Sequence, residues 1–252
     1  MYKKIFLISM LTLLFSNDYT FEDGIEFYNN RGDDHVLLVP SKNNISKAIS
    51  IFESKLNSAE DKEAGIYLIK SYYYMAQYVS QEKKDKTFYF NLAMTTAKQY
   101  IAKYPNSADM LYWYLASMSN WAKTVGLRAI TKNGGGNEFR EKAVDVIVLD
   151  PQYEDGGGYF LLGAVYFTAP YIPLINTWPN NKKAIKYFKK AVETGKATPL
   201  QQIYLAKALI KEGFNEEAKK ILVKTSNLIA DPNNFIEDSI YIEEAKNLLF
   251  EF

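Results

Sequence analysis

The chain has 252 residues, no cysteine, a single histidine and a formal net charge of +1. The absence of cysteine excludes disulfides, thiolate metal sites and cysteine nucleophiles, and His35 alone cannot form a zinc-binding His-Glu-x-x-His helix. The near-neutral charge argues against a nucleic-acid-binding protein, which needs a basic excess or a basic face to contact phosphates. With 48% hydrophobic and 23% charged residues, the chain is expected to bury a real core.

The first residues have the layout of a secretory signal. Two lysines precede an apolar run from Ile5 to Phe15, and a small serine then leads into polar residues. The run is shorter than the ~20 apolar residues that a membrane-spanning helix needs, and the alternative is a buried helix that begins with two lysines. We therefore expect residues 1–16 to be a signal peptide on a periplasmic or exported protein without a membrane span. Asn17 stands where a lipoprotein carries its lipid-bearing cysteine, so no lipid anchor is expected there.

The rest of the chain has a helical pattern. Apolar residues recur three and four positions apart, as at Ala48, Ile51 and Phe52, and no run alternates as a strand would. Proline and glycine breakers separate the periodic segments. We expect an all-α chain of roughly ten to twelve helices, with residues 17–42 as an N-terminal extension and 43–252 as one domain.

Five alanines indicate a repeated helix pair. In the tetratricopeptide pattern, a small residue on a first helix is followed by Ala-x-x-x-Phe on a second, with a 34-residue period. The marker alanines are Ala48, Ala93, Ala143, Ala184 and Ala218, spaced 45, 50, 41 and 34 residues apart. The sequence therefore predicts a tetratricopeptide-like α-solenoid or helical bundle of about four to five antiparallel helix pairs. Residues 236–252 would form a C-terminal capping helix.

Long insertions account for the spacings that exceed 34 residues. The two most readable insertions are residues 121–136 and 168–179. Insertions in a solenoid collect in loops on one face, which is often the binding face. We therefore expect these two insertions to border a binding surface.

A succession of motifs in the middle of the chain resembles a family of bacterial envelope tetratricopeptide proteins, similar to the T component associated with TRAP (tripartite ATP-independent periplasmic) transporters. The resemblance spans residues 43–230 and implies a helical periplasmic protein built around a hollow, which pairs with a solute-binding protein and contacts its ligand. The motifs are Leu111-Tyr112-Trp113-Tyr114-Leu115-Ala116, Asn120-Trp121-Ala122-Lys123, Leu149-Asp150-Pro151-Gln152-Tyr153, Gly156-Gly157-Gly158-Tyr159, Leu162-Gly163, Tyr166, Ala169-Pro170 and Lys183-Ala184-Ile185.

Several polar motifs favour structural roles over chemistry. Gly156 to Gly158 do not fit the phosphate-loop or dinucleotide patterns, so a close-packed turn is expected. The acidic residues around this turn, Asp150, Glu154 and Asp155, are expected to cap the following helix. Asp33-Asp34-His35 is interpreted as a polar surface turn rather than a metal site. No nucleophile-and-base pair, metal-ligand spacing or cofactor motif is found, so the sequence predicts no enzyme, no metal and no cofactor.

Aromatic side chains are the best functional lead. Tyr72, Tyr73 and Tyr74 are consecutive, so on a helix they point ~100° apart and at least one should be partly exposed. Tryptophans and basic residues gather around the two insertions, including Lys132 and Arg140. The alternative is that these aromatics pack between repeats. The predicted ligand- or partner-binding residues are Trp113, Asn120, Trp121, Lys123, Arg128, Tyr159, Tyr166 and Trp178.

Two functions follow as hypotheses. The first, implied by the resemblance, is a non-catalytic periplasmic binding or scaffold protein, an accessory of TRAP-type solute uptake that docks a solute-binding protein and a small organic ligand. The alternative is a general cell-envelope adaptor that binds a protein or peptide segment in its groove and has no small-molecule ligand. Neither function involves nucleic acid.

Overall fold

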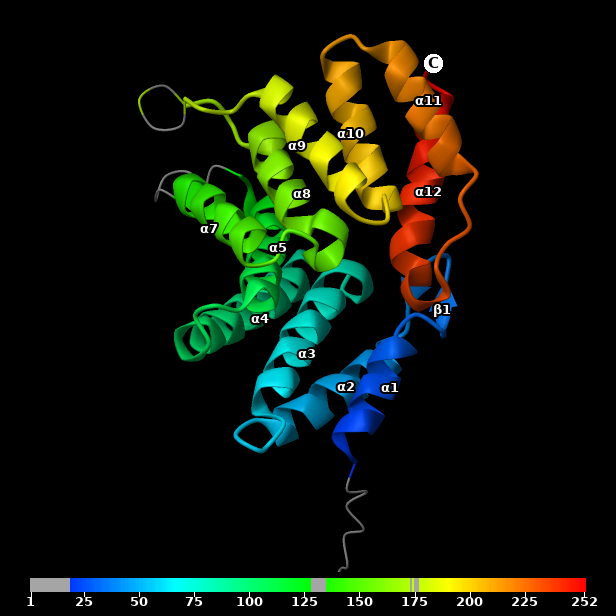
Figure 1. Cartoon of the computed structure of the whole chain (residues 1–252). Helices are drawn as coiled ribbons and strands as arrows, with labels where there is room; N and C mark the ends of the chain where they lie inside the picture. Colours follow the sequence, from blue (N-terminus) through cyan, green and yellow to red (C-terminus); the bar gives the residue numbers. More distant parts are fainter. Residues whose placement is uncertain (1–18, 128–134, 173, 175–176) are drawn as a thin grey trace, which may run out of the picture.

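The computed structural model describes residues 19–127, 135–172, 174 and 177–252. Within this part the predicted all-α fold class is confirmed, with eleven α-helices and one very short hairpin (Figure 1). The helices are α1 (Phe21–Asn29), α2 (Lys42–Lys55), α3 (Asp61–Tyr74), α4 (Lys83–Lys103), α5 (Ala108–Val125), α7 (Gly135–Leu149), α8 (Tyr153–Thr168), α9 (Asn181–Thr194), α10 (Pro199–Lys211), α11 (Asn215–Ser226) and α12 (Phe235–Leu249).

The marker alanines explain how the helices pair. They lie on α2, α4, α7, α9 and α11, the second helix of each of five consecutive pairs in the described chain, and all five side chains are fully buried. Because alanine is small, the first and second helices of a pair can approach closely. The predicted solenoid of helix pairs is confirmed, and α12 packs against α10 and α11 as the predicted capping helix.

Glycines on the first helices receive aromatic rings from the second helices. Gly24 of α1 faces Phe52, Gly65 of α3 faces Tyr100, and Gly163 of α8 faces Phe188. A β-carbon at Gly163 would lie 2.7 Å from the ring of Phe188, which is closer than van der Waals contact allows. We call this boundary between the two helices of a pair the seam.

Residues 19–42 belong to the helical array. A capping box of Thr20 and Asp23 begins α1, and α1 packs on α2 as the first helix of the first pair. The expectation that the chain contains no strand is corrected by an antiparallel hairpin, β1 (His35–Val36) and β2 (Val39–Pro40). Its strands of two residues each are too short to produce a recognisable alternation. Residues 1–16, the predicted signal peptide, lie outside the described part of the chain.

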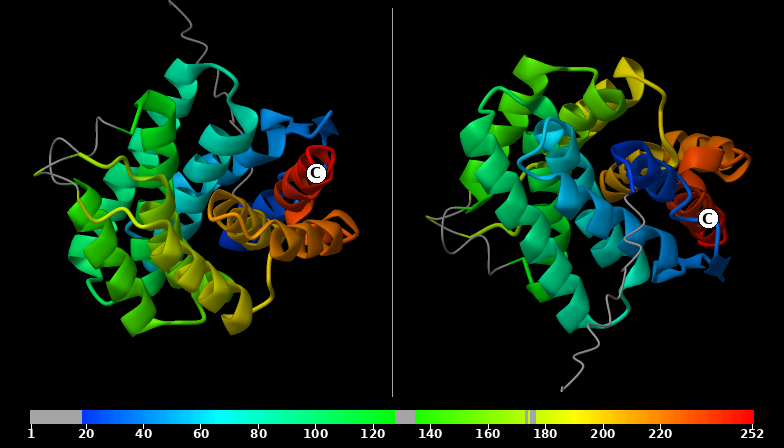
Figure 2. Two further views of the ribbon diagram at one scale, coloured as in Figure 1. Left: turned by 90° about the horizontal axis from the view of Figure 1, so that it is seen from above. Right: turned by 90° about the horizontal axis from the view of Figure 1, so that it is seen from below.

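The array curves until its two ends meet. Both views in Figure 2 show α12 beside α1 and the hairpin. The guanidinium of Arg31, just after α1, donates to the Glu237 carboxylate of α12 at 2.6 and 3.1 Å, and the ring of His35 lies 5.3 Å from that of Phe235. No helix in the described residues is long and apolar enough to cross a membrane.

Candidate functional site

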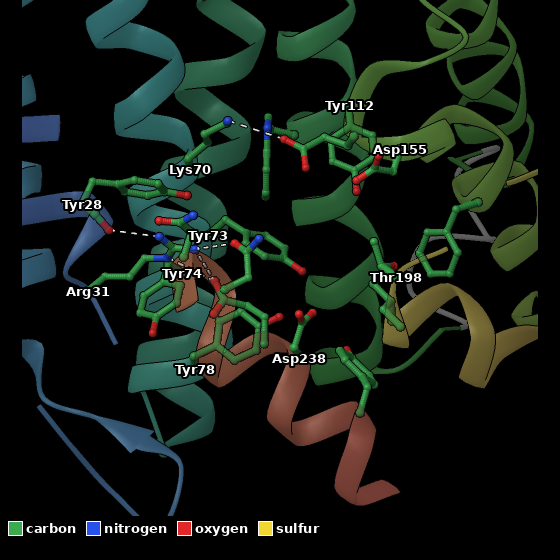
Figure 3. Close-up of a pocket in the computed structure, with 18 of the residues that line it drawn as sticks. Tyr28, Arg31, Lys70, Tyr73, Tyr74, Tyr78, Tyr112, Asp155, Thr198 and Asp238 are labelled. Carbon is green, nitrogen blue, oxygen red and sulfur yellow. Dashed lines mark hydrogen bonds and ion pairs between the residues drawn. The ribbon is translucent and has the colours of Figure 1, made fainter. Parts of the chain in front are cut away.

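A cavity of about 380 Å³ lies inside the closed array (Figure 3). Its wall is formed by residues of α1, α3, α5, α8 and α10, the first helix of every described pair, together with α12. Seven of its lining residues are tyrosines: Tyr28, Tyr67, Tyr73, Tyr74, Tyr78, Tyr112 and Tyr241. A volume of this size is in the range of small-molecule sites.

The end of α3 supplies much of the aromatic wall. Tyr72 and Tyr74 are buried, whereas Tyr73 is half-buried and lines the cavity, which confirms that the three consecutive tyrosines cannot all be core. The helix then widens into a π-turn, η1 (Met75–Val79), which adds Tyr78 to the wall. Burial raises the pKa of Tyr73 and Tyr78 well above the ordinary value, so both hydroxyls stay protonated at neutral pH.

A left-handed turn at the start of α8 brings two carboxylates to the cavity. Glu154, Asp155 and Gly156 have φ values of 47°, 54° and 84°, and the first two are in a conformation that costs an L-residue about 1–2 kcal/mol each. Two hydrogen bonds hold it: Asp155 Oδ1 accepts from the Lys196 N–H at 3.0 Å, and its carbonyl accepts from Gln201 Nε2 at 2.8 Å.

The left-handed turn corrects one expectation about capping. Asp150 does accept from the N–H groups of Gln152 and Tyr153 at the start of the helix, at 2.9 and 3.1 Å. Glu154 and Asp155 do not cap it, because Glu154 lies 3.5 Å from the Lys70 ammonium and Asp155 binds the segment before α10. The expected close-packed turn is present, since a β-carbon on Gly158 would lie 2.8 Å from Ile147.

Carboxylates outnumber cations in the cavity wall. The cations are Arg31 and Lys70, and the carboxylates are Glu154, Asp155, Glu237 and Asp238. The part of the wall that the structure describes therefore has a formal charge of −2. No group of three or more His, Cys, Asp or Glu residues that could hold a metal ion occurs in the described chain.

Three of the predicted binding residues lie in or next to this wall. Trp113 lines the cavity, and its indole Nε1 donates to the Tyr153 hydroxyl at 3.0 Å. Behind it, Asn120 donates to the hydroxyl of Tyr73, also at 3.0 Å. The exposed Lys123 donates to the Tyr204 hydroxyl at 2.8 Å.

Of the other described members of the predicted set, Trp121 and Trp178 belong to the insertions, and Tyr166 lies beside Trp178. Trp178 packs edge-on against Tyr166, with ring centroids 5.5 Å apart, and Arg140 lies 4.7 Å from its ring centroid. Tyr159 is contacted by Lys190, and the buried indole N–H of Trp121 has no hydrogen-bond partner within the described chain. A small apolar cavity of about 40 Å³ lies where the insertions meet, between Leu127 and Pro170. Arg128 and Lys132 are outside the described residues.

Sequence reasoning missed the charged part of the wall. Arg31 and Glu237 are 206 positions apart and have no motif in common, and Asp238 is one of several acidic residues on α12. The only local signal was the glycine run at 156–158, which indicates an unusual backbone but not the direction of the carboxylates before it.

A family model described as regulator of microtubule dynamics protein 1-3 matches residues 37–172, which is 136 of the 252 residues. The chain belongs to this family. The matched segment of this regulator-of-microtubule-dynamics family member includes α2 to α8, and with them the tyrosines of α3 and the left-handed turn. Among curated proteins, no sequence matches the chain significantly.

This family membership overturns the resemblance to the TRAP-associated T component. The expectations that rested on it, an accessory role in TRAP-type solute uptake and a periplasmic or exported location, are corrected with it. The alternative of a cell-envelope adaptor falls for the same reason. The motifs misled because many of their residues, such as Leu115, Leu162 and Ala184, are buried helix-packing residues that any helix-pair protein can share.

Proposed function

We propose that this member of the regulator-of-microtubule-dynamics family is a non-catalytic binding protein whose central cavity holds its ligand. The observation that carries the proposal is the construction of the cavity, in which the first helix of every described pair and the capping helix contribute side chains to one wall. A left-handed backbone at that wall supports it, since such strain persists where the surrounding structure enforces it and clusters at ligand sites.

The chemistry of the wall favours binding over catalysis. As far as it is described, the wall contains no serine or histidine, and its tyrosine hydroxyls stay protonated. Thr198, the one hydroxyl of its type in the wall, caps α10 by accepting from the Gln201 N–H. We therefore propose no covalent catalysis, which requires a nucleophile with an adjacent base.

Native mass spectrometry of the full chain tests this function. A molecule retained from the expression host should be lost in Leu200→Trp, which fills the cavity, and kept in Val148→Trp, which adds the same side chain to the exposed face of α7. A retained molecule that both variants bind equally well would place the site elsewhere and contradict the proposal.

A second candidate comes from the family match alone. The family's description names regulation of microtubule dynamics, and we propose an action on microtubules as the second function of this chain. The test is the rate of tubulin polymerisation, followed by turbidity, with the full chain added. Rates that are unchanged over a range of chain concentrations would reject this candidate and leave cavity binding intact.

A further inference from the structure

The cations of the cavity wall are already engaged by the protein. All three nitrogens of the Arg31 guanidinium donate hydrogen bonds, to Glu237, to Asn234 and to the carbonyl of Tyr28. Lys70 lies beside Glu154 and over the ring of Trp113, at 3.5 and 5.3 Å. An anionic ligand would have to displace these partners.

Two carboxylates of the wall accept a backbone hydrogen bond but form no ion pair within the described chain. Asp238 Oδ2 accepts from the backbone N–H of Asp231 at 3.0 Å, and Asp155 Oδ1 accepts from that of Lys196. Neither has an ion-pair partner within the described chain. Desolvation, with the nearby charges of Glu237 and Asp231, raises the pKa of Asp238, so a cation beside it would relieve an existing cost.

The aromatic wall points to the same class of ligand. Tyrosine and tryptophan rings attract cations through their negative faces, and cages of such rings recognise ammonium groups. Aromatic rings and the two carboxylates without an ion pair line one cavity, as Figure 3 shows for Tyr73, Tyr78 and Asp238. The hydroxyl of Tyr74, also in the wall and 2% exposed as a residue, is buried and has no hydrogen-bond partner in the described chain.

We propose that the cavity binds an organic cation, with an ammonium or guanidinium group placed between the tyrosine rings and the carboxylates of Asp155 and Asp238. This inference rests on the proposed binding function and names its ligand class. The volume of about 380 Å³ suits a small amine or one basic side chain of a partner protein, which share the same head-group chemistry.

Three four-carbon probes of different charge test whether the cavity prefers a cation: butane-1,4-diamine, butane-1,4-diol and butanedioate. Binding to the full chain is followed by calorimetry and by tryptophan fluorescence, to which Trp113 of the cavity wall contributes. We expect the diamine to bind at least tenfold more tightly than the diol and the dianion. If the diol or the dianion binds as tightly as the diamine, the cation inference is wrong and the binding function stands. If no probe binds and no molecule is retained from the host, both proposals fail.

Neutral amide variants assign the contacts. Asp238→Asn and Asp155→Asn should each weaken diamine binding about tenfold, and asparagine keeps an oxygen acceptor and tolerates the left-handed backbone at position 155. Glu243→Gln removes the same charge from the exposed side of α12 and should leave the affinity unchanged. Equal losses in all three variants would show a general charge effect and overturn the assignment.

The two sources of the cation are separated with capped peptides. A peptide with one lysine or arginine that binds more tightly than the capped single amino acid indicates a partner's side chain, because the flanking backbone then contributes. A diamine that binds more tightly than every peptide indicates a free amine. Both outcomes support a cationic ligand, whereas peptides with glutamate that bind best would contradict it.

Discussion

The seam and the cavity wall treat their carboxylates in opposite ways. On the seam side, polar groups are satisfied: Asp61 of α3 accepts from Lys103, from the hydroxyl of Tyr100 at 2.8 Å and from the Asn57 N–H at 2.7 Å. In the cavity wall, Asp238 of α12 has no ion-pair partner and the hydroxyl of Tyr74 has no hydrogen-bond partner among the described residues.

The pKa shifts of two aspartates express this difference. The Lys103 ammonium, helped by Asn57 and Tyr100 and opposed by burial, lowers the pKa of Asp61 from 3.8 to about 2. Burial raises the pKa of Asp238. The seam therefore stabilises the charge of its carboxylate, whereas the cavity holds one at a cost that a ligand can relieve. Changes at the seam should affect stability, and changes at the cavity should affect binding.

The ion pair between Arg31 and Glu237, which joins the two ends of the array, is an exception: it lies at the cavity but should affect stability. Although Glu237 lines the cavity, its removal leaves the Arg31 guanidinium, 6% exposed, without a countercharge. Glu237→Ala should lower the free energy of unfolding by about 3 kcal/mol, measured by urea denaturation. Glu243→Gln, at an exposed pair on the same helix, should cost less than about 0.5 kcal/mol. Similar values for the two variants would mean that the array is not held closed by this pair.

The next largest loss of stability should come from adding a β-carbon at the seam. Gly65→Ala would place a methyl group against the ring of Tyr100, and such overpacking costs about 2 kcal/mol. Gly126→Ala, which meets nothing within 4 Å but has a φ of 111°, should cost about 1 kcal/mol from backbone strain alone. The thermal unfolding midpoints of the two variants check the order, and a larger loss at Gly126 would contradict the tight seam.

The stability contributed by Asp61 should depend on pH. Because its folded pKa lies below the ordinary value, its contribution is complete above pH 4 and is lost as the pH falls toward 2. Asp61→Asn should therefore lower the free energy of unfolding by about 1–2 kcal/mol at pH 7 and have little effect near pH 2. Denaturation curves at both pH values test this, and an equal loss at both would point to packing rather than charge.

Replacing Asp238 should change stability in the opposite direction from replacing Asp61, and by the smallest amount of the changes predicted here. Its folded pKa is raised, so ionisation above pH 4 costs stability in the absence of a ligand. Asp238→Asn should slightly raise the unfolding midpoint at pH 7 and leave it unchanged at pH 3. A lower midpoint at pH 7 would show that the carboxylate is satisfied, which would remove the contrast between seam and cavity.

The sequence predicts the seam because seam contacts repeat. Ala48, Ala93, Ala143, Ala184 and Ala218 occupy the same place in successive pairs and are fully buried, so a period in the sequence corresponds to a position in the fold. The same repetition explains the mistaken family, since residues required by helix packing do not distinguish one helix-pair family from another.

The cavity was not predictable in the same way. The consecutive tyrosines of α3 indicated only that one ring would be partly exposed. The carboxylates reach one wall because the array curves, a property of the summed angles between helices rather than of any local segment. The left-handed backbone at Glu154 and Asp155 is signalled only by the glycines that follow these residues. The predicted Trp113 lies in the wall, whereas Trp178 and Tyr166 pack together near the insertions.

The contact between Arg31 and Glu237 also changes how the repeat array can open. In a linear solenoid each terminal repeat has one neighbour, so unfolding begins by fraying at the ends. Here the first helix gains a second neighbour 206 residues away, and the array is a ring in its contacts although it is a line in its covalent chain. Neither end can fray without exposing a buried guanidinium, so amide exchange in α1 and α12 should be as slow as in the central pairs.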